Sequence, residues 1–401
     1  MRFRYSAEEN GRHVKRAVVY TQDEHKINFS DVDTQAVYIT GRLQASGYET
    51  YIVGGAVRDL ILGKKPKDFD IATAASPARI KKVFRNARII GRRFRLVHVY
   101  FGPKIIEVST FRSLKDGATS NTFGTIDEDV QRRDFSLNAL FYDPMKQIVV
   151  DYVGGMDDIR KRVIRPIIDL SEIFTDDPVR MIRAVKYSAA VNFKLPFSLK
   201  RKIRKQSPLL AEISPSRLTE EIFKIINSPY AVYIVKALDA MGLYQYLQPR
   251  AAELFRTRQG FRDRYLKTFS ALNQETAGSL PGETLTVLIR DYLEDTADWD
   301  GKRNEDQAAP HSASDRFKNA FVLARKFVLP MNPPRIELDN ALKLLFAEHG
   351  VIIKKTRFHE RPPRHHEAKT TPVKETELPD EAKPPNKRRR RRRIRKESTV
   401  E

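Results

Sequence analysis

The chain has 401 residues, of which 41% are hydrophobic, and its 73 Lys and Arg against 51 Asp and Glu give a formal net charge of +22. This length and apolar content exclude a wholly disordered chain and predict two or three domains with real cores, while the absence of cysteine excludes disulfides and thiolate metal sites. The excess of positive charge favours a polyanionic partner, with nucleic acid as the natural candidate.

The start of the chain and its composition favour a cytoplasmic protein without a membrane partner. A cysteine-free sequence suits a reducing compartment, and no run of about 18 apolar residues is present to span a bilayer. The polar start MRFRYSAEENGRHVKR lacks the apolar core of a secretory signal. We expect residues 1–30 to form an N-terminal extension.

Residues 31–170 alternate helix and strand signals, which predicts an α/β head domain built on a mixed sheet. Apolar spacing, glycines and a Ser-Pro pair mark the element boundaries. The expected elements are, in order, a helix over 35–47, the strand TYIV, a Gly54-Gly55 turn, a helix closed by Gly63, a helix over 77–84, and the strands RFRLVHVYF and KIIEVSTF.

Within this head, the stretch KPKDFDIAT places Asp68 and Asp70 one residue apart. In an extended chain both carboxylates face the same side, where they repel each other unless a divalent cation lies between them. A solvated loop edge is the simpler alternative. The Gly54-Gly55 turn is no Walker A loop, but a glycine turn before a helix leaves backbone N–H groups open to a phosphate, and Arg58 adds a cation.

After Asp169 the strand signals stop, and apolar residues recur at three- and four-residue steps. The sequence therefore predicts an all-α neck over 171–230 and an all-α body over 231–355, with a polar loop near 294–315. Residues 356–401 are Pro-rich with few large apolar side chains, so we expect a disordered basic tail.

The tail contains KRRRRRRIRK, in which nine of ten residues are basic; subtracting these nine from +22 leaves +13 on the rest of the chain. A dense arginine run beside a basic body favours added affinity for RNA phosphates over a merely solubilising role. The tail residues expected to bind RNA include Lys387, Arg388, Arg389 and Arg390.

Five stretches in order, YIVGGAVRDLILGKKPKDFDIATAA, QRRDFSLNAL, DYVGG, DDPVRMIRAVKY and SRLTEEIFK, resemble the motifs of the class II nucleotidyltransferases. That superfamily comprises bacterial poly(A) polymerases and tRNA CCA-adding enzymes. The resemblance covers residues 31–227 and implies a polymerase-β-like head followed by neck, body and tail. It also implies template-independent addition of nucleotides to RNA 3′ ends.

For the acid pair, the resemblance implies two Mg²⁺ ions held by Asp68 and Asp70, one activating the RNA 3′-hydroxyl and the other steadying the phosphates and the departing pyrophosphate. A third carboxylate is usual in such sites, and both Glu107 and Asp134 are candidates. Glu107 is otherwise a solvent-facing strand residue. Asp134 is otherwise a helix cap or the ion-pair partner of a neighbouring arginine.

For the nucleotide, the resemblance implies contacts in the head and a base-reading pair in the neck. Asp177 and Arg180 are three apart on a predicted helix and so share a face. In the family the matching pair accepts adenine and cytosine, which present the same amino donor and ring-nitrogen acceptor, and rejects guanine and uracil. An exposed salt bridge is the simpler alternative. The other implied nucleotide-binding residues are Gly54, Gly55, Arg58, Arg133, Asn138, Arg183 and Arg217.

The base-reading pair does not separate a poly(A) polymerase from a CCA-adding enzyme. The segment IIGRRFRLVHVYFG, residues 89–102, resembles the one that marks bacterial poly(A) polymerases. Its Arg92, Arg93 and Arg95 would bind the phosphate backbone of RNA. We therefore expect a poly(A) polymerase that uses ATP and releases pyrophosphate. The alternatives are a tRNA CCA-adding enzyme and a non-catalytic RNA-binding protein of the same fold.

The expected partners are RNA 3′ ends and ATP, with RNA-decay machinery as a further candidate and a monomer favoured over an oligomer.

Overall fold

The protein is described by a computed structural model that covers residues 2–7, 13–91, 96–113, 122–275, 281–301 and 312–353. Several predictions lie outside these residues and stay predictions. They concern the tail over 356–401 with Lys387, Arg388, Arg389 and Arg390, and the head arginines Arg92, Arg93 and Arg95.

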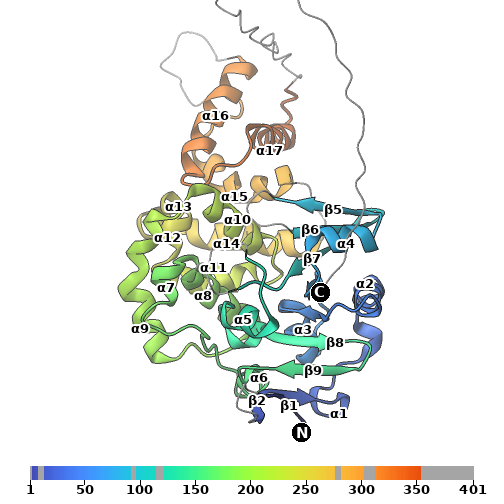
Figure 1. Ribbon diagram of the computed structural model, residues 1–401. Coiled ribbons are helices and arrows are strands. Elements are labelled where there is room, and N and C mark those ends of the chain that lie inside the picture. The colour runs from blue at the N-terminus through green and yellow to red at the C-terminus, as the bar shows by residue number, and fades with distance from the viewer. Residues whose placement is uncertain are drawn as a thin grey trace, which may run out of the picture. The chain divides into compact units, whose positions relative to one another are not determined.

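One nine-stranded sheet forms the head, in the order β1-β2-β9-β8-β3-β4-β7-β6-β5 (Figure 1). Strands β4 and β7 are parallel and the other neighbouring pairs are antiparallel, so the sheet is mixed, as predicted. The strands are β1 (Arg2–Ala7), β2 (His13–Tyr20), β3 (Thr50–Val53), β4 (Asp70–Thr73), β5 (Ala87–Ile90), β6 (Leu96–Phe101), β7 (Lys104–Thr110), β8 (Leu140–Asp143) and β9 (Ile148–Asp151).

Helices cover both faces of this sheet because alternate strand residues point to opposite sides. Ile52 of β3 lies in the core shared with α2 and α4, whereas its neighbours Tyr51 and Val53 lie in a second core with α5. The helices of the head are α1 (Gln22–His25), α2 (Thr34–Ala45), α3 (Gly55–Ile61), α4 (Pro77–Val83), α5 (Ile126–Gln131) and α6 (Gly155–Lys161).

The described residues of the N-terminal extension predicted over 1–30 add strands β1 and β2 to the head sheet. Strand β2 pairs antiparallel with β9, from Val18 opposite Asp151 to Tyr20 opposite Val149. Tyr20 is also buried in the main core. The partner strand lies far along the chain, and local sequence patterns carry no record of such a pairing.

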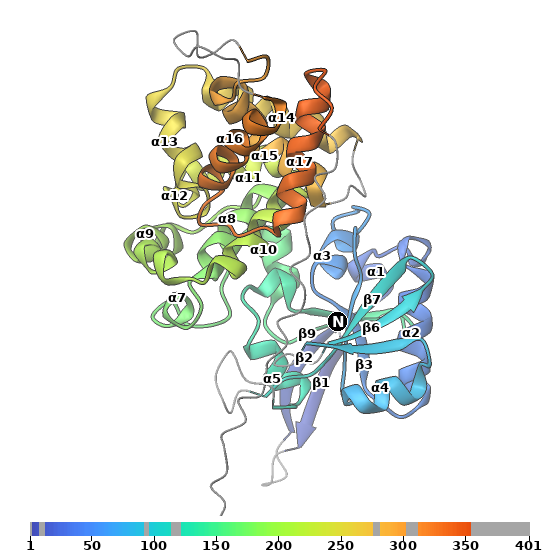
Figure 2. The ribbon, with the colours of Figure 1, turned by 90° about the horizontal axis from the view of Figure 1, so that it is seen from above.

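The rest of the described chain is helical, as predicted. The neck contains α7 (Ile173–Asp176), α8 (Val179–Val191), α9 (Phe197–Gln206) and α10 (Pro215–Ile226). The body contains α11 (Ala231–Ala240), α12 (Tyr244–Leu247), α13 (Pro249–Thr257), α14 (Phe261–Glu275), α15 (Pro281–Thr296), α16 (Ala313–Phe327) and α17 (Arg335–Glu348). Figure 2 shows these helices gathered to one side of the head sheet, and one continuous hydrophobic core joins them to it.

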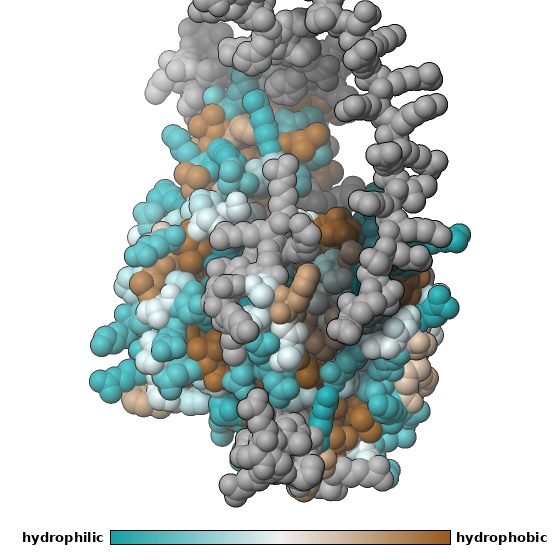
Figure 3. All heavy atoms as spheres, in the orientation of Figure 1, coloured by the Kyte–Doolittle hydropathy of each residue, from teal (hydrophilic) through white to brown (hydrophobic). Residues whose placement is uncertain are grey.

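On the face in Figure 3, hydrophilic side chains surround small separate apolar patches outside the grey atoms. Among the described residues, no helix combines the length and apolarity that crossing a bilayer requires.

Candidate active site

The predicted acid pair lies where the loop before β4 enters the sheet. Phe69 is buried, while Asp68 and Asp70 on either side of it are exposed. This alternation is the one expected of an extended segment, and it places both carboxylates on the outer side. Asp70, the first residue of β4, lies opposite Val53, the last residue of β3, so the acid pair sits beside the turn that follows β3.

The electrostatics around Asp70 favour a bound cation. Surrounding protein atoms, followed by the negative charges of Glu107 and Asp68, raise the pKa of Asp70 to about 6, although Arg133 and Lys224 oppose the change. The side chain is exposed, so crowding by protein atoms and like charges, rather than full burial, accounts for the raised pKa. A divalent cation would relieve this repulsion.

The structure brings one of the two candidate third carboxylates to the acid pair. Glu107 of β7 lies directly opposite Asp70 in the parallel register of β4 and β7. Asp134 instead accepts a hydrogen bond from the backbone N–H of Phe135 at 2.8 Å, and its charge acts on Arg183 and Tyr187. The geometry therefore favours Glu107, whose Oε2 lies 3.7 Å from Nε2 of His98.

The donor set fits Mg²⁺ in its chemistry. Asp68, Asp70 and Glu107 supply carboxylate oxygens, which Mg²⁺ prefers, and phosphate oxygens and water complete its shell in nucleotide-processing sites. Within the described ranges, no group of three or more acidic or histidine side chains converges on a single point. The carboxylates approach one another closely enough to interact, without forming a closed cage.

The turn after β3 is confirmed as a Gly54-Gly55 turn that leads directly into α3. Gly54 has φ 74° and ψ −136°, a conformation that is open essentially only to glycine. A Cβ at Gly54 would lie 3.9 Å from Oδ2 of Asp70, so space allows a methyl group and the backbone does not. The turn thus places the backbone of Gly54 beside the acid pair.

Gly54→Ala is expected to lower activity about tenfold or more, because strain of about 1–3 kcal/mol would shift the turn against Asp70. Gly63→Ala is the matched control, since Gly63 also has positive φ, at 66°, and has no atom within 4 Å of a new Cβ. Both variants should lose stability, as followed by thermal unfolding, but only Gly54→Ala should lose nucleotide addition. Equal activity in the two would contradict a role for the turn.

Behind the turn, Arg58 joins α3 to the segment around Asn138. Its Nη1 donates to Oδ1 of Asn138 at 2.8 Å, its Nε donates to Asp59, and its guanidinium lies 5.7 Å from the ring centre of Tyr187. Arg133 donates to the backbone oxygen of Asn138 at 3.1 Å. The sequence-predicted residues Arg58, Arg133 and Asn138 therefore form one connected group next to the turn.

The predicted base-reading pair is placed differently from the expectation. Asp177 precedes α8 rather than lying on it, so it does not share a helix face with Arg180. The carboxylate of Asp177 accepts two hydrogen bonds from Nη2 of Arg217, at 2.9 and 2.8 Å, whereas Arg180 pairs with Asp176. The reason is Pro178, which cannot donate within a helix and breaks it after Asp176.

A buried ion cluster supports this region. Glu221 of α10 accepts from Arg183 at 2.9 Å and from Lys186 at 2.6 Å, both on α8. Burial alone would raise the pKa of Glu221, but the two cations lower it to about 2. Sequence reasoning named Arg183 and missed Lys186, although the spacing of three residues on one helix would have placed the two side by side.

Two lysines in the loop before the acid pair also contact the neck and the start of the body, and sequence reasoning missed both. Lys64 donates to the hydroxyl of Tyr230 at 3.0 Å, and Lys67 donates to the backbone oxygen of Asn227 at 3.4 Å. Nothing local in the sequence signals these contacts, because the partners are distant along the chain. They tie the loop that carries Asp68 to the segment between α10 and α11.

Two parts of the chain match known protein families. Residues 50–165 match the family described as the poly A polymerase head domain, and residues 192–255 match the family described as the probable RNA and SrmB-binding site of polymerase A.

Among curated proteins, poly(A) polymerase I of Salmonella typhi is 42% identical over 253 residues, which cover 59% of this chain and 54% of that protein. The CCA-adding enzyme of Geobacillus thermodenitrificans is 39% identical over 225 residues, which cover 55% of each. The chain spans about half the length of these curated relatives.

Among solved structures, the Bacillus stearothermophilus CCA-adding enzyme in complex with CTP is similar, with a TM-score of 0.51 at 27% identity. The match covers 78% of this chain and 82% of that chain.

Proposed function

The chain belongs to the class II nucleotidyltransferase superfamily, and on that premise we propose that it is a template-independent poly(A) polymerase. In the reaction, the 3′-hydroxyl oxygen of an RNA attacks the α-phosphorus of ATP. A new phosphodiester bond forms, the bond to the β-phosphate breaks, and pyrophosphate leaves. The observation that carries the proposal is the carboxylate group of Asp68, Asp70 and Glu107 beside a glycine turn and Arg58.

The carboxylates would hold two Mg²⁺ ions. Bound there, Mg²⁺ lowers the pKa of an attacking hydroxyl and stabilises the charge of the leaving pyrophosphate. The protein's own groups would orient the nucleotide. The glycine turn of Gly54 and Gly55 and the positive charge of Arg58 suit the triphosphate. Asn138, whose side-chain oxygen accepts a hydrogen bond from Arg58, keeps its amide N–H groups for the ribose.

We propose that the base is selected at Asp177. Arg217 fixes this carboxylate through two hydrogen bonds, so that it can accept from the amino group of adenine in a defined direction. Arg180, which is held by Asp176, would donate to the neighbouring ring nitrogen. Guanine presents a carbonyl where adenine presents the amino group, and the carboxylate rejects it.

Asp177→Ala is expected to narrow the preference for ATP over GTP by about tenfold, because a bidentate base contact is worth about 1–3 kcal/mol of discrimination. Glu172→Ala, which removes an exposed carboxylate nearby, is the matched control and should leave the preference unchanged. The measurement is incorporation into an unstructured RNA with each nucleotide supplied singly. An unaltered ATP to GTP ratio in Asp177→Ala would refute the assignment.

The same four-nucleotide assay tests the function as a whole. Long products with ATP alone are the expected result. Addition limited to three residues on a tRNA that lacks its 3′ end would replace the proposal with CCA addition, which the similarity to CCA-adding enzymes keeps as the second candidate. Binding without any product would leave an RNA-binding protein.

We propose a cytoplasmic location and RNA 3′ ends as the macromolecular partner. The net charge of +22 supports a polyanionic partner.

A further inference from the structure

The loop that leads into the acid pair follows a fixed path. We call residues 62–69, which include Asp68, the acid loop. Near its start, the backbone N–H of Lys64 donates to the backbone oxygen of Asp59 on α3 at 2.8 Å. Further along, Pro66 is buried. The backbone of the acid loop is therefore held to the head, and its lysine side chains are left to reach other parts of the molecule.

Lys64 reaches from the acid loop to the end of a neck helix. Its Nζ donates to the hydroxyl of Tyr230 at 3.0 Å and to the backbone oxygen of Ala190 at 3.4 Å. Nζ also lies 4.6 Å from the ring centre of Tyr230. Ala190 belongs to the last turn of α8, where backbone oxygens have no partner within the helix. Lys64 thus supplies a donor and a positive charge at the helix end that favours both.

Lys67 makes the same kind of contact with a second neck helix. Its Nζ donates at 3.4 Å to the backbone oxygen of Asn227, the residue that ends α10. Figure 2 shows α3 on the side of the head that faces α8 and α10. From α3, Arg58 contacts the ring of Tyr187, which lies three residues before Ala190 on the same side of α8. The C-terminal ends of both neck helices are therefore joined to the head at the acid loop.

The same two helices carry the base-selecting groups at their other ends. Asp177 lies two residues before α8 begins, and its partner Arg217 lies in the first turn of α10. Glu221 joins the helices through Arg183. A helix of 13 residues, such as α8, is about 20 Å long and transmits a displacement from one end to the other. Moving its C-terminal end against the acid loop would therefore move Asp177 relative to Asp68.

We propose that Lys64 is a positioning residue, which holds the acid loop against α8 so that the metal-binding acids and the base-selecting carboxylate keep the separation that one nucleoside triphosphate requires. The inference rests on the proposed function, in which both groups act on the same nucleotide. Lys64 itself contacts neither the nucleotide nor the RNA. Its effect on rate is large because a displacement of about 1 Å in an active site costs about 10²-fold.

A direct contact between Lys64 and a phosphate is the alternative role for a lysine at this place. The Nζ of Lys64 is already bonded to two oxygen atoms of the protein, and its side chain is only partly exposed. The neighbouring Lys65 is fully accessible by comparison, being one of the exposed residues of the loop. The contacts therefore favour positioning over phosphate binding.

The test uses the full chain with Lys64→Met, Lys64→Arg and Tyr230→Phe. Methionine keeps the length of the side chain without its charge, and phenylalanine removes only the hydroxyl that accepts from Lys64. With ATP and an unstructured RNA, kcat should fall about tenfold or more in Lys64→Met and about threefold in Tyr230→Phe, the factor for one hydrogen bond. In both, the Mg²⁺ concentration for half-maximal rate should rise and the KM for RNA should stay unchanged. Lys64→Arg should restore most of the rate.

Two matched controls separate this contact from general changes in charge or hydroxyl content. Lys65→Met removes a neighbouring exposed lysine of the acid loop, and Tyr233→Phe removes the hydroxyl of a tyrosine that is 66% exposed on α11. Both should behave like the unmodified protein. An equal loss in Lys65→Met and Lys64→Met would overturn the inference. So would a loss in Lys64→Met with no effect of Tyr230→Phe, which would assign Lys64 to a phosphate.

A second readout does not depend on catalysis. Without substrates, backbone amides of the acid loop should exchange hydrogen about tenfold faster in Lys64→Met, because the loop opens more often when its contact with the neck is lost. Tyr230→Phe should show the same direction and Lys65→Met no change. Unchanged exchange in Lys64→Met and Tyr230→Phe would overturn the inference. Faster exchange in a protein that adds no nucleotide would disprove the proposed function and uphold Lys64 as the residue that positions the loop.

Discussion

Asp70→Asn is expected to lower the rate of nucleotide addition by about 10³-fold or more and to leave RNA binding intact. Magnesium contributes several kcal/mol of transition-state stabilisation, and each 1.36 kcal/mol corresponds to a factor of ten. Asparagine keeps the shape of the side chain and removes the charge that would bind the ion. Asp68→Asn should have a similar effect. The rate is measured in single turnovers at saturating ATP and Mg²⁺.

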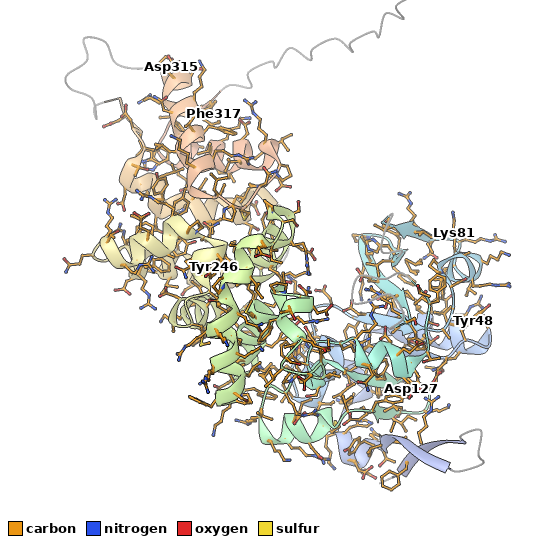
Figure 4. All side chains as sticks on the ribbon, turned by 60° about the vertical axis from the view of Figure 1, so that its left-hand side comes forward. Tyr48, Lys81, Asp127, Tyr246, Asp315 and Phe317 are labelled. Atoms are coloured by element: carbon orange, nitrogen blue, oxygen red, sulfur yellow. The ribbon has the colours of Figure 1, made fainter. Side chains whose placement is uncertain are left out.

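Three other carboxylates provide the comparison. Glu107→Gln should approach the severity of Asp70→Asn, because Glu107 lies opposite Asp70 in the sheet. Asp134→Asn should be milder, since its carboxylate is directed to Phe135 and to the Arg183 region. Asp127→Asn on α5, labelled in Figure 4, changes an acidic residue of the head outside the acid pair and should be close to neutral. An unchanged rate of nucleotide addition in both Asp68→Asn and Asp70→Asn would refute the proposed metal site.

Glu221→Gln is expected to destabilise the protein by about 3–5 kcal/mol, the typical result of removing one partner from a buried ion pair. Glu221 is 2% exposed and is the shared partner of Arg183 and Lys186. Glutamine would leave both cations without their counter-charge, and Lys186 is itself buried. The free energy of unfolding, measured by denaturant titration, reports the loss.

The neighbouring residue supplies a matched control. Glu220 pairs with Lys224 at the surface, where its side chain is 63% exposed, so Glu220→Gln should cost less than about 1 kcal/mol. If Glu220→Gln and Glu221→Gln lower the free energy of unfolding equally, burial does not account for the stabilising effect of Glu221.

The effect of Glu221 should also depend on pH in a defined direction. Its pKa falls from 4.5 to about 2 on folding, so its stabilisation is fully present above pH 4.5 and disappears as the pH falls through about 2. The difference in stability between the unmodified protein and Glu221→Gln should therefore shrink on acidification through this window. A difference that stays constant down to pH 2 would show that Glu221 does not act through its charge.

Much of the site was predictable because its determinants are local. The alternation of Asp68, Phe69 and Asp70 identifies an extended segment with two outward acids, and the glycines after TYIV identify the turn. Pro178 carried local information that the helix prediction overlooked, for it places Asp177 outside α8. These features act over a few residues through backbone sterics and side-chain direction.

The sequence by itself determined several central strands and helices of the head, the helical neck and body, the glycine turn and the residue types available to bind metal, phosphate and RNA. Only the tertiary structure decided that Glu107 rather than Asp134 lies opposite Asp70, that Arg217 holds Asp177, and that β2 extends the head sheet. Each of these depends on strand order or helix packing between distant segments, and no local propensity encodes which distant segments meet, because that choice is made by the burial of the whole core.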